Sequence, residues 1–266
     1  MQSLSANALR RHFYGTYFSL RMGLALLALT LPITLYLMGK LLYGLPLQAS
    51  LSAYFYAATE GQCATFPMRT IFVGYLFAIG FGLYLYKGLT PLENRLLNIA
   101  GVCTVLLAIF PERLTTAEAA TDSRIAQLFQ NCPAVEQWAE AQTLWWVHYT
   151  AGVGLFVTLA VVSWVCACKT LDYLPPQKGS ATLFRLIYRT LSVLMLALPL
   201  SAYWLVTSFA DSVNTLFYVE LAAIWTFAVY WVVKSRELAL SGLEHDPEAA
   251  LMKEQGAARP DEGGAR

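Results

Sequence analysis

The chain has 266 residues, of which 57% are hydrophobic and 13% are charged, and its mean hydropathy is positive. A soluble domain carries about a quarter charged residues, so this composition indicates an integral membrane protein. The formal net charge of +1, without a basic face or a long basic run, gives no reason to expect a nucleic-acid partner.

Six apolar runs approach the length of about 20 residues that a helix needs to cross the hydrocarbon core of a bilayer. We predict an all-α fold, a bundle of six transmembrane helices that fills residues 1–240 and leaves no separate soluble domain. The first run follows Arg10 and Arg11, as in a signal peptide, but it is too long and no small-residue cleavage site follows it. The predicted spans are 22–44, 68–88, 95–110, 144–168, 184–208 and 214–234.

Two segments between the spans are long enough to have structure of their own. The segment that joins the first two spans contains SLSAYFY and mixes aromatic with small polar residues, so we expect it to lie on the membrane. The second, 112–143, has the pattern of two short amphipathic helices, TTAEAATDSRIAQLF and AVEQWAEAQ, separated at Cys132 and Pro133. We expect these helices to form a lid over the outer ends of the spans.

The distribution of lysine and arginine predicts the orientation, because positively charged loops stay on the cytoplasmic side. With the N-terminus inside, 14 of the 18 basic residues fall in inner segments, and the other 4 are Lys40, Arg69, Arg113 and Arg124. We therefore expect both termini to be cytoplasmic. The tail 241–266 is polar and rich in Gly, Pro and Glu, which is typical of a disordered segment.

The five cysteines separate by compartment once the orientation is assigned. Cys103, Cys166 and Cys168 fall within spans, where a thiol acts as a small hydrophobe. Cys63 and Cys132 belong to the outer segments, where an oxidising compartment permits a disulfide. We predict a Cys63–Cys132 bridge between the first outer segment and the lid; two free thiols are the alternative.

Ionisable side chains in or beside the spans are candidate functional residues, because each is costly to place in hydrocarbon. Nearly all of them fall in the outer half. Glu220 lies about six residues inside the sixth span, about 9 Å deep at 1.5 Å per residue, and it needs a cation, a hydrogen-bond donor or a proton. We predict one outward-facing polar pocket with six candidate ligand-binding residues: His148, Glu220, Arg69, Ser52, Tyr54 and Asp211.

Some of these residues also have a simpler explanation. Lys40 and Arg69 can extend to lipid headgroups. His148 stands in the sequence among Trp145, Trp146 and Tyr149, as in the aromatic belt at a membrane boundary. In the pocket interpretation, by contrast, Glu220 pairs with Arg69, Lys40 or His148.

Small residues recur every four positions in the second span, at Gly74, Ala78 and Gly82. This spacing places three small side chains on one helix face and lets another helix approach closely. We predict that this face is a helix–helix interface, which is also a candidate surface for oligomer formation.

The block MRTIFVGYLFAIGFGLYLYKGLTPLENRLLNIAGVCTVLLAIFP, preceded by SLSAYFY, resembles a group of uncharacterised bacterial membrane proteins of about this length. The shared features are R-x-x-F-V-G, a Y-K-G turn, E-N, N-x-A-G and a terminal F-P, over about a quarter of the chain. The resemblance implies a bacterial inner membrane. More remotely, the six-span plan is similar to the DRAM-type membrane families, some of which are linked to lipid remodelling; that similarity is topological and transfers no residues.

The intramembrane zinc hydrolases of the ceramidase type also have a serine near the membrane edge. Their metal site needs three histidines together with Asp and Ser. This chain has three histidines, and the predicted topology places His12 and His245 on the cytoplasmic side, away from His148. A His-rich zinc site is therefore excluded under this topology, and we expect no metal or other cofactor.

Three functions fit the outer residues, and the first of them, which is not enzymatic, is favoured. It is the binding of a lipid or other amphipathic molecule in the pocket. The second is a proton-coupled carrier in which Glu220 titrates, although no internal repeat or pair of broken helices supports it. The third is an intramembrane hydrolase with Ser52 as nucleophile, His148 as base and Glu220 as orienting acid, which no flanking motif supports.

Overall fold

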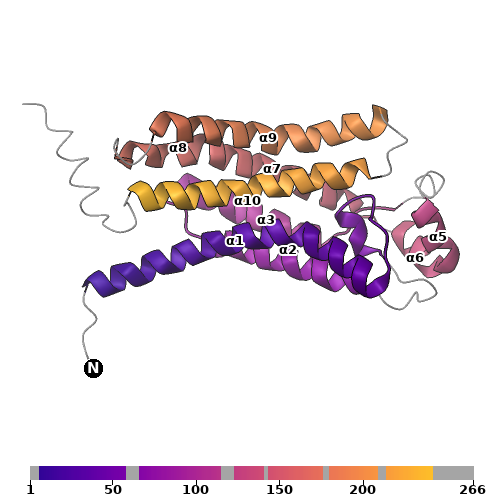
Figure 1. Cartoon of the computed structure of the whole chain (residues 1–266). Helices are drawn as coiled ribbons and strands as arrows, with labels where there is room; N and C mark the ends of the chain where they lie inside the picture. Colours follow the sequence, from indigo (N-terminus) through magenta and orange to yellow (C-terminus); the bar gives the residue numbers. More distant parts are fainter. Residues whose placement is uncertain are drawn as a thin grey trace, which may run out of the picture.

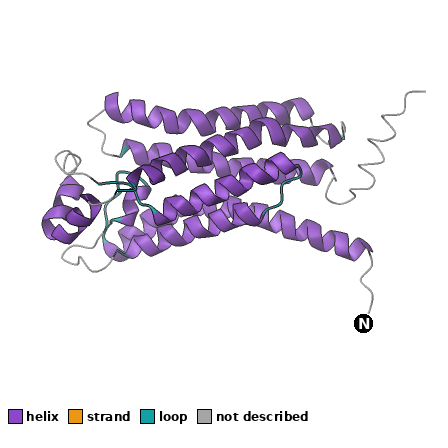
Figure 2. Ribbon diagram, turned by 180° about the vertical axis from the view of Figure 1, so that it is seen from behind, coloured by secondary structure: helices purple, strands orange, loops and turns teal. Residues whose placement is uncertain are grey.

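The computed structural model describes residues 6–57, 66–114, 123–140, 143–175, 180–208 and 214–241. These residues form helices joined by loops (Figure 2). Within this described part of the chain, six helices are long and apolar enough to cross a membrane, which confirms the predicted all-α bundle of six spans. The spans are Tyr14–Tyr43, Pro67–Leu85, Pro91–Ile109, Trp145–Tyr173, Ala181–Ser201 and Thr215–Ser241.

Several helices extend beyond the predicted spans. The first helix begins well before residue 22, and the last continues past residue 234 to Ser241. The fourth span changes its hydrogen-bonding pattern, because a π-helix interrupts it after Val161. The helices that make up the six spans are α1 (Ala6–Tyr43), α2 (Pro67–Leu85), α3 (Pro91–Ile109), α7 (Trp145–Val161), π-helix η2 (Val162–Cys166), α8 (Ala167–Lys169), 3₁₀-helix η3 (Thr170–Tyr173), α9 (Ala181–Ser208) and α10 (Thr215–Ser241).

The six spanning helices pack as a closed ring. Along it, α1 contacts α2, α2 contacts α3, α3 contacts α7, α7 contacts α9, α9 contacts α10, and α10 returns to α1. Figure 1 shows these helices running nearly parallel, whereas the first turns of α1 diverge from the others. Each helix therefore buries one face inside the ring and leaves the opposite face for lipid.

The ring has two distinguishable ends (Figure 1). We call the end that carries α5 (Ser123–Asn131) and α6 (Pro133–Glu140) the loop end. We call the end where α1 begins and α10 finishes the terminal end. In the orientation predicted from lysine and arginine, the loop end faces outward.

The two predicted lid helices exist and meet at Cys132, as the sequence pattern indicates. They lie at one end of the bundle in Figure 1. Phe129 and Val135 are buried in the same apolar cluster as Phe217 from α10, so the pair of helices packs onto the loop end.

The segment after α1, which we expected to lie on the membrane, packs its aromatic residues into the bundle. Residues 44–57, called the plug below, contain the 3₁₀-helix η1 (Ser52–Phe55). Leu51, Tyr54 and Tyr56 are at most 5% exposed, because they pack in the apolar cluster of the loop end. The aromatic residues of SLSAYFY thus face protein and not lipid.

The close approach of α2 and α3 occurs at Gly80 and Gly101, and not along the predicted face of Gly74, Ala78 and Gly82. A Cβ on Gly101 would lie 2.6 Å from the Gly80 carbonyl oxygen, so α2 and α3 meet where neither residue has a side chain. In the predicted stripe, Gly82 faces Leu24 of α1, whereas Gly74 has no atom within 4 Å of its Cβ position. The use of Gly74, Ala78 and Gly82 for oligomer formation stays a prediction.

Cys103, Cys166 and Cys168 are free thiols in the spanning segments, as expected. Cys132 is 3% exposed and is not one of these free thiols. Cys63 lies outside the described residues, as do Asp211 and the tail beyond Ser241. The Cys63–Cys132 bridge, the role of Asp211 and the disorder of the tail therefore stay predictions.

Candidate functional site

The plug is fixed to the loop end through its backbone. The Ala49 carbonyl accepts a hydrogen bond of 2.8 Å from the amide of Phe217, at the first turn of α10. At the other end of the plug, the Tyr56 hydroxyl donates to the Glu112 carbonyl at 2.7 Å. These contacts connect the plug to α10 and to the segment after α3, so its position depends on both.

Glu220 of α10 binds the start of η1. Its Oε2 atom accepts a hydrogen bond of 2.6 Å from the Leu51 amide. The first amides of a helix have no acceptor within that helix, and a carboxylate is a strong acceptor for them. Glu220 therefore acts first as an anchor for the plug.

This contact differs from the pairing predicted for Glu220. Arg69 donates instead to the Phe55 carbonyl at 3.1 Å, and Lys40 donates to the Tyr36 hydroxyl at 3.2 Å on the exposed side of α1. His148 hydrogen bonds to Ser52 and to Phe110. The sequence indicated that Glu220 needs a partner, but backbone amides of a distant segment cannot be recognised in a sequence as that partner.

Ser50 and Glu112 connect the plug to the segment after α3. Ser50 Oγ donates to Glu112 Oε1 at 2.9 Å and accepts from the Ala53 amide at 2.8 Å. Burial, with the Glu112 charge adding to it, raises the pKa of the Tyr56 hydroxyl above its ordinary value of about 10. Tyr56 therefore stays a hydrogen-bond donor at neutral pH.

His148 joins three segments at the loop end. It lies in the first turn of α7 and is 6% exposed, whereas its neighbours Trp146 and Tyr149 are 51% and 46% exposed. Its Nδ1 atom is 2.7 Å from the Phe110 carbonyl oxygen, and its Nε2 atom is 3.2 Å from Ser52 Oγ. His148 thus points inward, away from the aromatic belt in which the simpler interpretation places it.

The Phe110 carbonyl determines the tautomer of a neutral His148 ring. A carbonyl oxygen only accepts, so Nδ1 carries the hydrogen and Nε2 keeps its lone pair. The Ser52 hydroxyl then donates to Nε2. Ser52 is half-buried, so this pair places a hydroxyl and an imidazole base together near the protein surface.

Arg69 and Tyr54, which were also predicted for the pocket, mainly hold the plug in place. The Arg69 guanidinium lies between the rings of Phe55 and Phe66, 4.3 Å and 4.2 Å from their centroids. Such stacking stabilises a cation and holds α2 against the plug. Tyr54 is 1% exposed, and its ring lies 6.4 Å from that of Phe217. Of the predicted residues that the structure describes, Ser52 and His148 are therefore the pair that combines direct contact with partial exposure.

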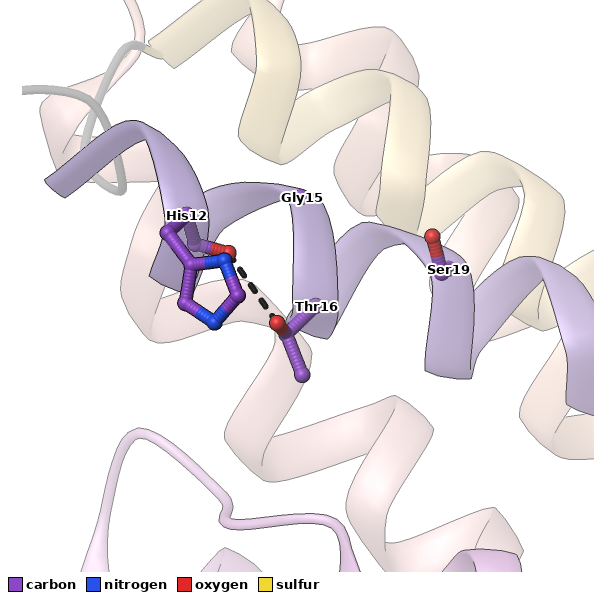
Figure 3. Close-up of a pocket in the computed structure, with 4 residues that line it drawn as sticks. All are labelled: His12, Gly15, Thr16 and Ser19. Atoms are coloured by element: carbon purple, nitrogen blue, oxygen red, sulfur yellow. Dashed lines mark hydrogen bonds between the residues drawn. The ribbon is translucent and has the colours of Figure 1, made fainter. Parts of the chain in front are cut away.

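A surface hollow at the terminal end does not contain this chemistry. Its lining residues come from the diverging first part of α1, and all four are exposed (Figure 3). The Thr16 hydroxyl donates to the His12 carbonyl at 3.0 Å, within the same helix. The lining residues are His12, Gly15, Thr16 and Ser19.

Sequence reasoning missed several residues of the loop end. Ser50 is the first residue of the SLSAYFY segment, and Phe110 is the first residue of the F-P motif. Neither motif shows that Ser50 contacts Glu112 or that the Phe110 carbonyl orients a histidine. Sequence reasoning also missed a second group of buried charges at the terminal end, which includes Arg21 and Lys234. Both were counted as loop cations because they flank the apolar runs.

The chain matches no protein-family model, no curated protein and no solved structure. The resemblance to uncharacterised bacterial membrane proteins, and remotely to the DRAM-type families, stays a prediction.

Proposed function

We propose that the loop end binds the polar end of a lipid or other amphipathic molecule, and that Ser52 and His148 contact it. The Ser52–His148 pair carries this proposal: the Ser52 hydroxyl donates its hydrogen to His148 Nε2, and its oxygen still offers an acceptor lone pair at a half-buried position. Trp145 and Tyr149 lie within one turn of His148 on α7, and they are 38% and 46% exposed. An amphipathic ligand would hydrogen bond to Ser52 through its polar head and would cover the exposed Trp145 and Tyr149 rings with its apolar tail.

The backbone around Ser52 favours binding over catalysis. An acyl-transfer site needs donors aimed at a developing oxyanion. The nearest amides are already used, since Leu51 donates to Glu220 and Ala53 donates to Ser50. We therefore place the non-enzymatic function first.

Lipid binding is tested by native mass spectrometry of the delipidated protein after addition of phosphatidylethanolamine and phosphatidylglycerol. We expect Ser52→Ala to weaken binding of at least one of these lipids by on the order of fivefold, because one hydrogen bond contributes about 1 kcal/mol. Thr150→Ala is the matched control, since Thr150 is exposed on α7 and bonds only backbone carbonyls of its own helix. Equal affinities for the wild type and Ser52→Ala contradict the proposal.

A hydrolase or acyltransferase is a second candidate, because the tautomer of His148 suits a general base toward Ser52. Glu220 does not orient His148 in this arrangement; the Phe110 carbonyl does. Labelling of Ser52 by a fluorophosphonate, lost in His148→Gln, would favour this candidate. An unlabelled wild type rejects it.

The geometry gives less support to the proton-coupled carrier. Titration of Glu220 would weaken the 2.6 Å contact that holds the plug, so the group is committed to structure. We retain Glu220 as an anchor and do not propose it as a transported-proton site.

A further inference from the structure

The terminal end contains a second cluster of buried polar groups, separate from the loop end. Four charged side chains from three helices are at most 2% exposed there. Charges inside a membrane protein are costly unless they are paired, and they mark functional positions by default. The four are Arg21 of α1, Glu93 of α3, and Lys234 and Glu237 of α10.

Lys234 and Glu237 form the centre of this cluster. Lys234 Nζ lies 2.9 Å from Glu237 Oε2 and donates to Thr170 Oγ1 at 2.6 Å. The hydroxyls of Thr170 and Tyr188 lie 3.0 Å and 3.1 Å from the same Oε2 atom. Thr170 opens η3, just after the interruption of α7 by a π-helix, a feature frequently found at functional sites.

The contacts of Glu237 are all on one oxygen. Its Oε1 atom is buried and makes no hydrogen bond to any described residue. The same holds for the Tyr230 hydroxyl and the Trp231 Nε1 atom, which lie within two turns on α10. Buried polar atoms of native proteins are nearly always paired with protein or with ordered water, so three such atoms within two turns of one helix indicate an additional binding partner.

The neighbouring charges restrict what that partner is. A cation on Oε1 would lie close to the Lys234 ammonium that contacts Oε2, and an anion would be repelled by the Glu237 carboxylate itself. The rings of Tyr188, Tyr230 and Trp231 are at most 1% exposed, so any molecule that contacts these atoms is enclosed by protein and must be small. An uncharged, water-sized hydrogen-bond donor meets both conditions.

We propose that Glu237 Oε1 and the Tyr230 hydroxyl form an internal site for small uncharged hydrogen-bonding molecules, of which water is the simplest. Tyr188 lies beside both residues, because its hydroxyl contacts Glu237 Oε2 and its ring centroid lies 6.1 Å from that of Tyr230. The terminal end of α10 is then hydrated inside the bundle. This site is independent of the lipid site at the loop end.

X-ray hydroxyl-radical footprinting in H₂¹⁸O tests the proposal with water as the probe, because radicals formed from internal water oxidise adjacent aromatic rings. We expect Tyr230 and Trp231 to be modified on the order of tenfold faster than Met195. Met195 is a sensitive reporter that is 0% exposed in the same apolar cluster. Protection of Tyr230 and Trp231 to the level of Met195 would overturn the proposal.

A charge-neutral double variant tests whether Glu237 holds the water. Lys234→Met with Glu237→Leu removes both ions together, so neither is left unpaired. We expect modification of Trp231 to fall severalfold in this variant, with thermal unfolding used to verify that it is folded. Unchanged modification in the folded variant contradicts the proposal, and if the variant does not fold, the wild-type comparison alone decides.

Discussion

At the scale of single residues, Glu220 and His148 show how a polar side chain in a membrane bundle obtains its partner from the backbone. Glu220 accepts from the Leu51 amide, and His148 is oriented by the Phe110 carbonyl. Both contacts join positions that are far apart in the sequence. The plug is consequently a structural element of the bundle, and Ser52 is presented by it.

Replacing Glu220 tests its anchoring role. Glu220→Leu leaves the Leu51 amide without its acceptor, so we expect a loss of about 1–3 kcal/mol in the free energy of unfolding and faster hydrogen exchange of the peptide 49–57. Glu220→Gln keeps an acceptor oxygen and should lose less. A Gln variant as damaged as the Leu variant would show that the charge matters more than the acceptor, contrary to this account.

At the scale of elements, the contact between α2 and α3 is set by glycines at the point of closest approach. Gly101→Ala would place a Cβ 2.6 Å from a carbonyl oxygen of the other helix, so the helices must separate. We expect a loss of about 1–3 kcal/mol of stability from overpacking. Gly74→Ala is the matched control, because its Cβ meets no atom within 4 Å. Equal melting temperatures for the two variants would contradict the packing described.

The predicted Cys63–Cys132 bridge also belongs to this scale. Burial alone protects Cys132 from alkylation in the folded state, so the assay must be made on denatured protein. We expect denatured, unreduced protein to resist alkylation at both cysteines and reduced protein to react at both, as measured by peptide mass spectrometry. Alkylation of either cysteine before reduction rules out the bridge.

Hydropathy was sufficient to predict the six spans and the two lid helices, because apolar length and amphipathic pattern are local properties. The packing of the plug into the bundle was not predicted, since SLSAYFY has the same composition whether its rings face lipid or protein. Lys234 and Glu237 were missed because the sixth helix continues to Ser241, beyond the end of the apolar run. The partners of Glu220 and His148 are main-chain atoms, which have no signature in a sequence.

At the scale of the whole molecule, the bundle has different polar chemistry at its two ends. The loop end has a half-buried hydroxyl–imidazole pair, whereas the terminal end has a closed Lys234–Glu237 pair. The apolar faces between them fit a bilayer. The function proposed for the loop end therefore depends on that end facing a compartment or leaflet that contains the ligand.

Orientation is tested by reporter fusions in a bacterial inner membrane. With both termini cytoplasmic, a reporter at Asp122 and one at Glu248 should lie on opposite sides, because an odd number of spans separates them. Alkaline phosphatase activity at Asp122 and its absence at Glu248 would agree with the prediction. Activity at both positions would refute it.

The most direct measurement of the proposed function is an experimental structure of the protein in a lipid nanodisc. We expect density for a polar head within about 3 Å of Ser52 Oγ, with its tail along Trp145 and Tyr149 and with Glu220 on the Leu51 amide. A Ser52–His148 pair covered by protein, with lipid density confined to the outer faces of the helices, would contradict the account.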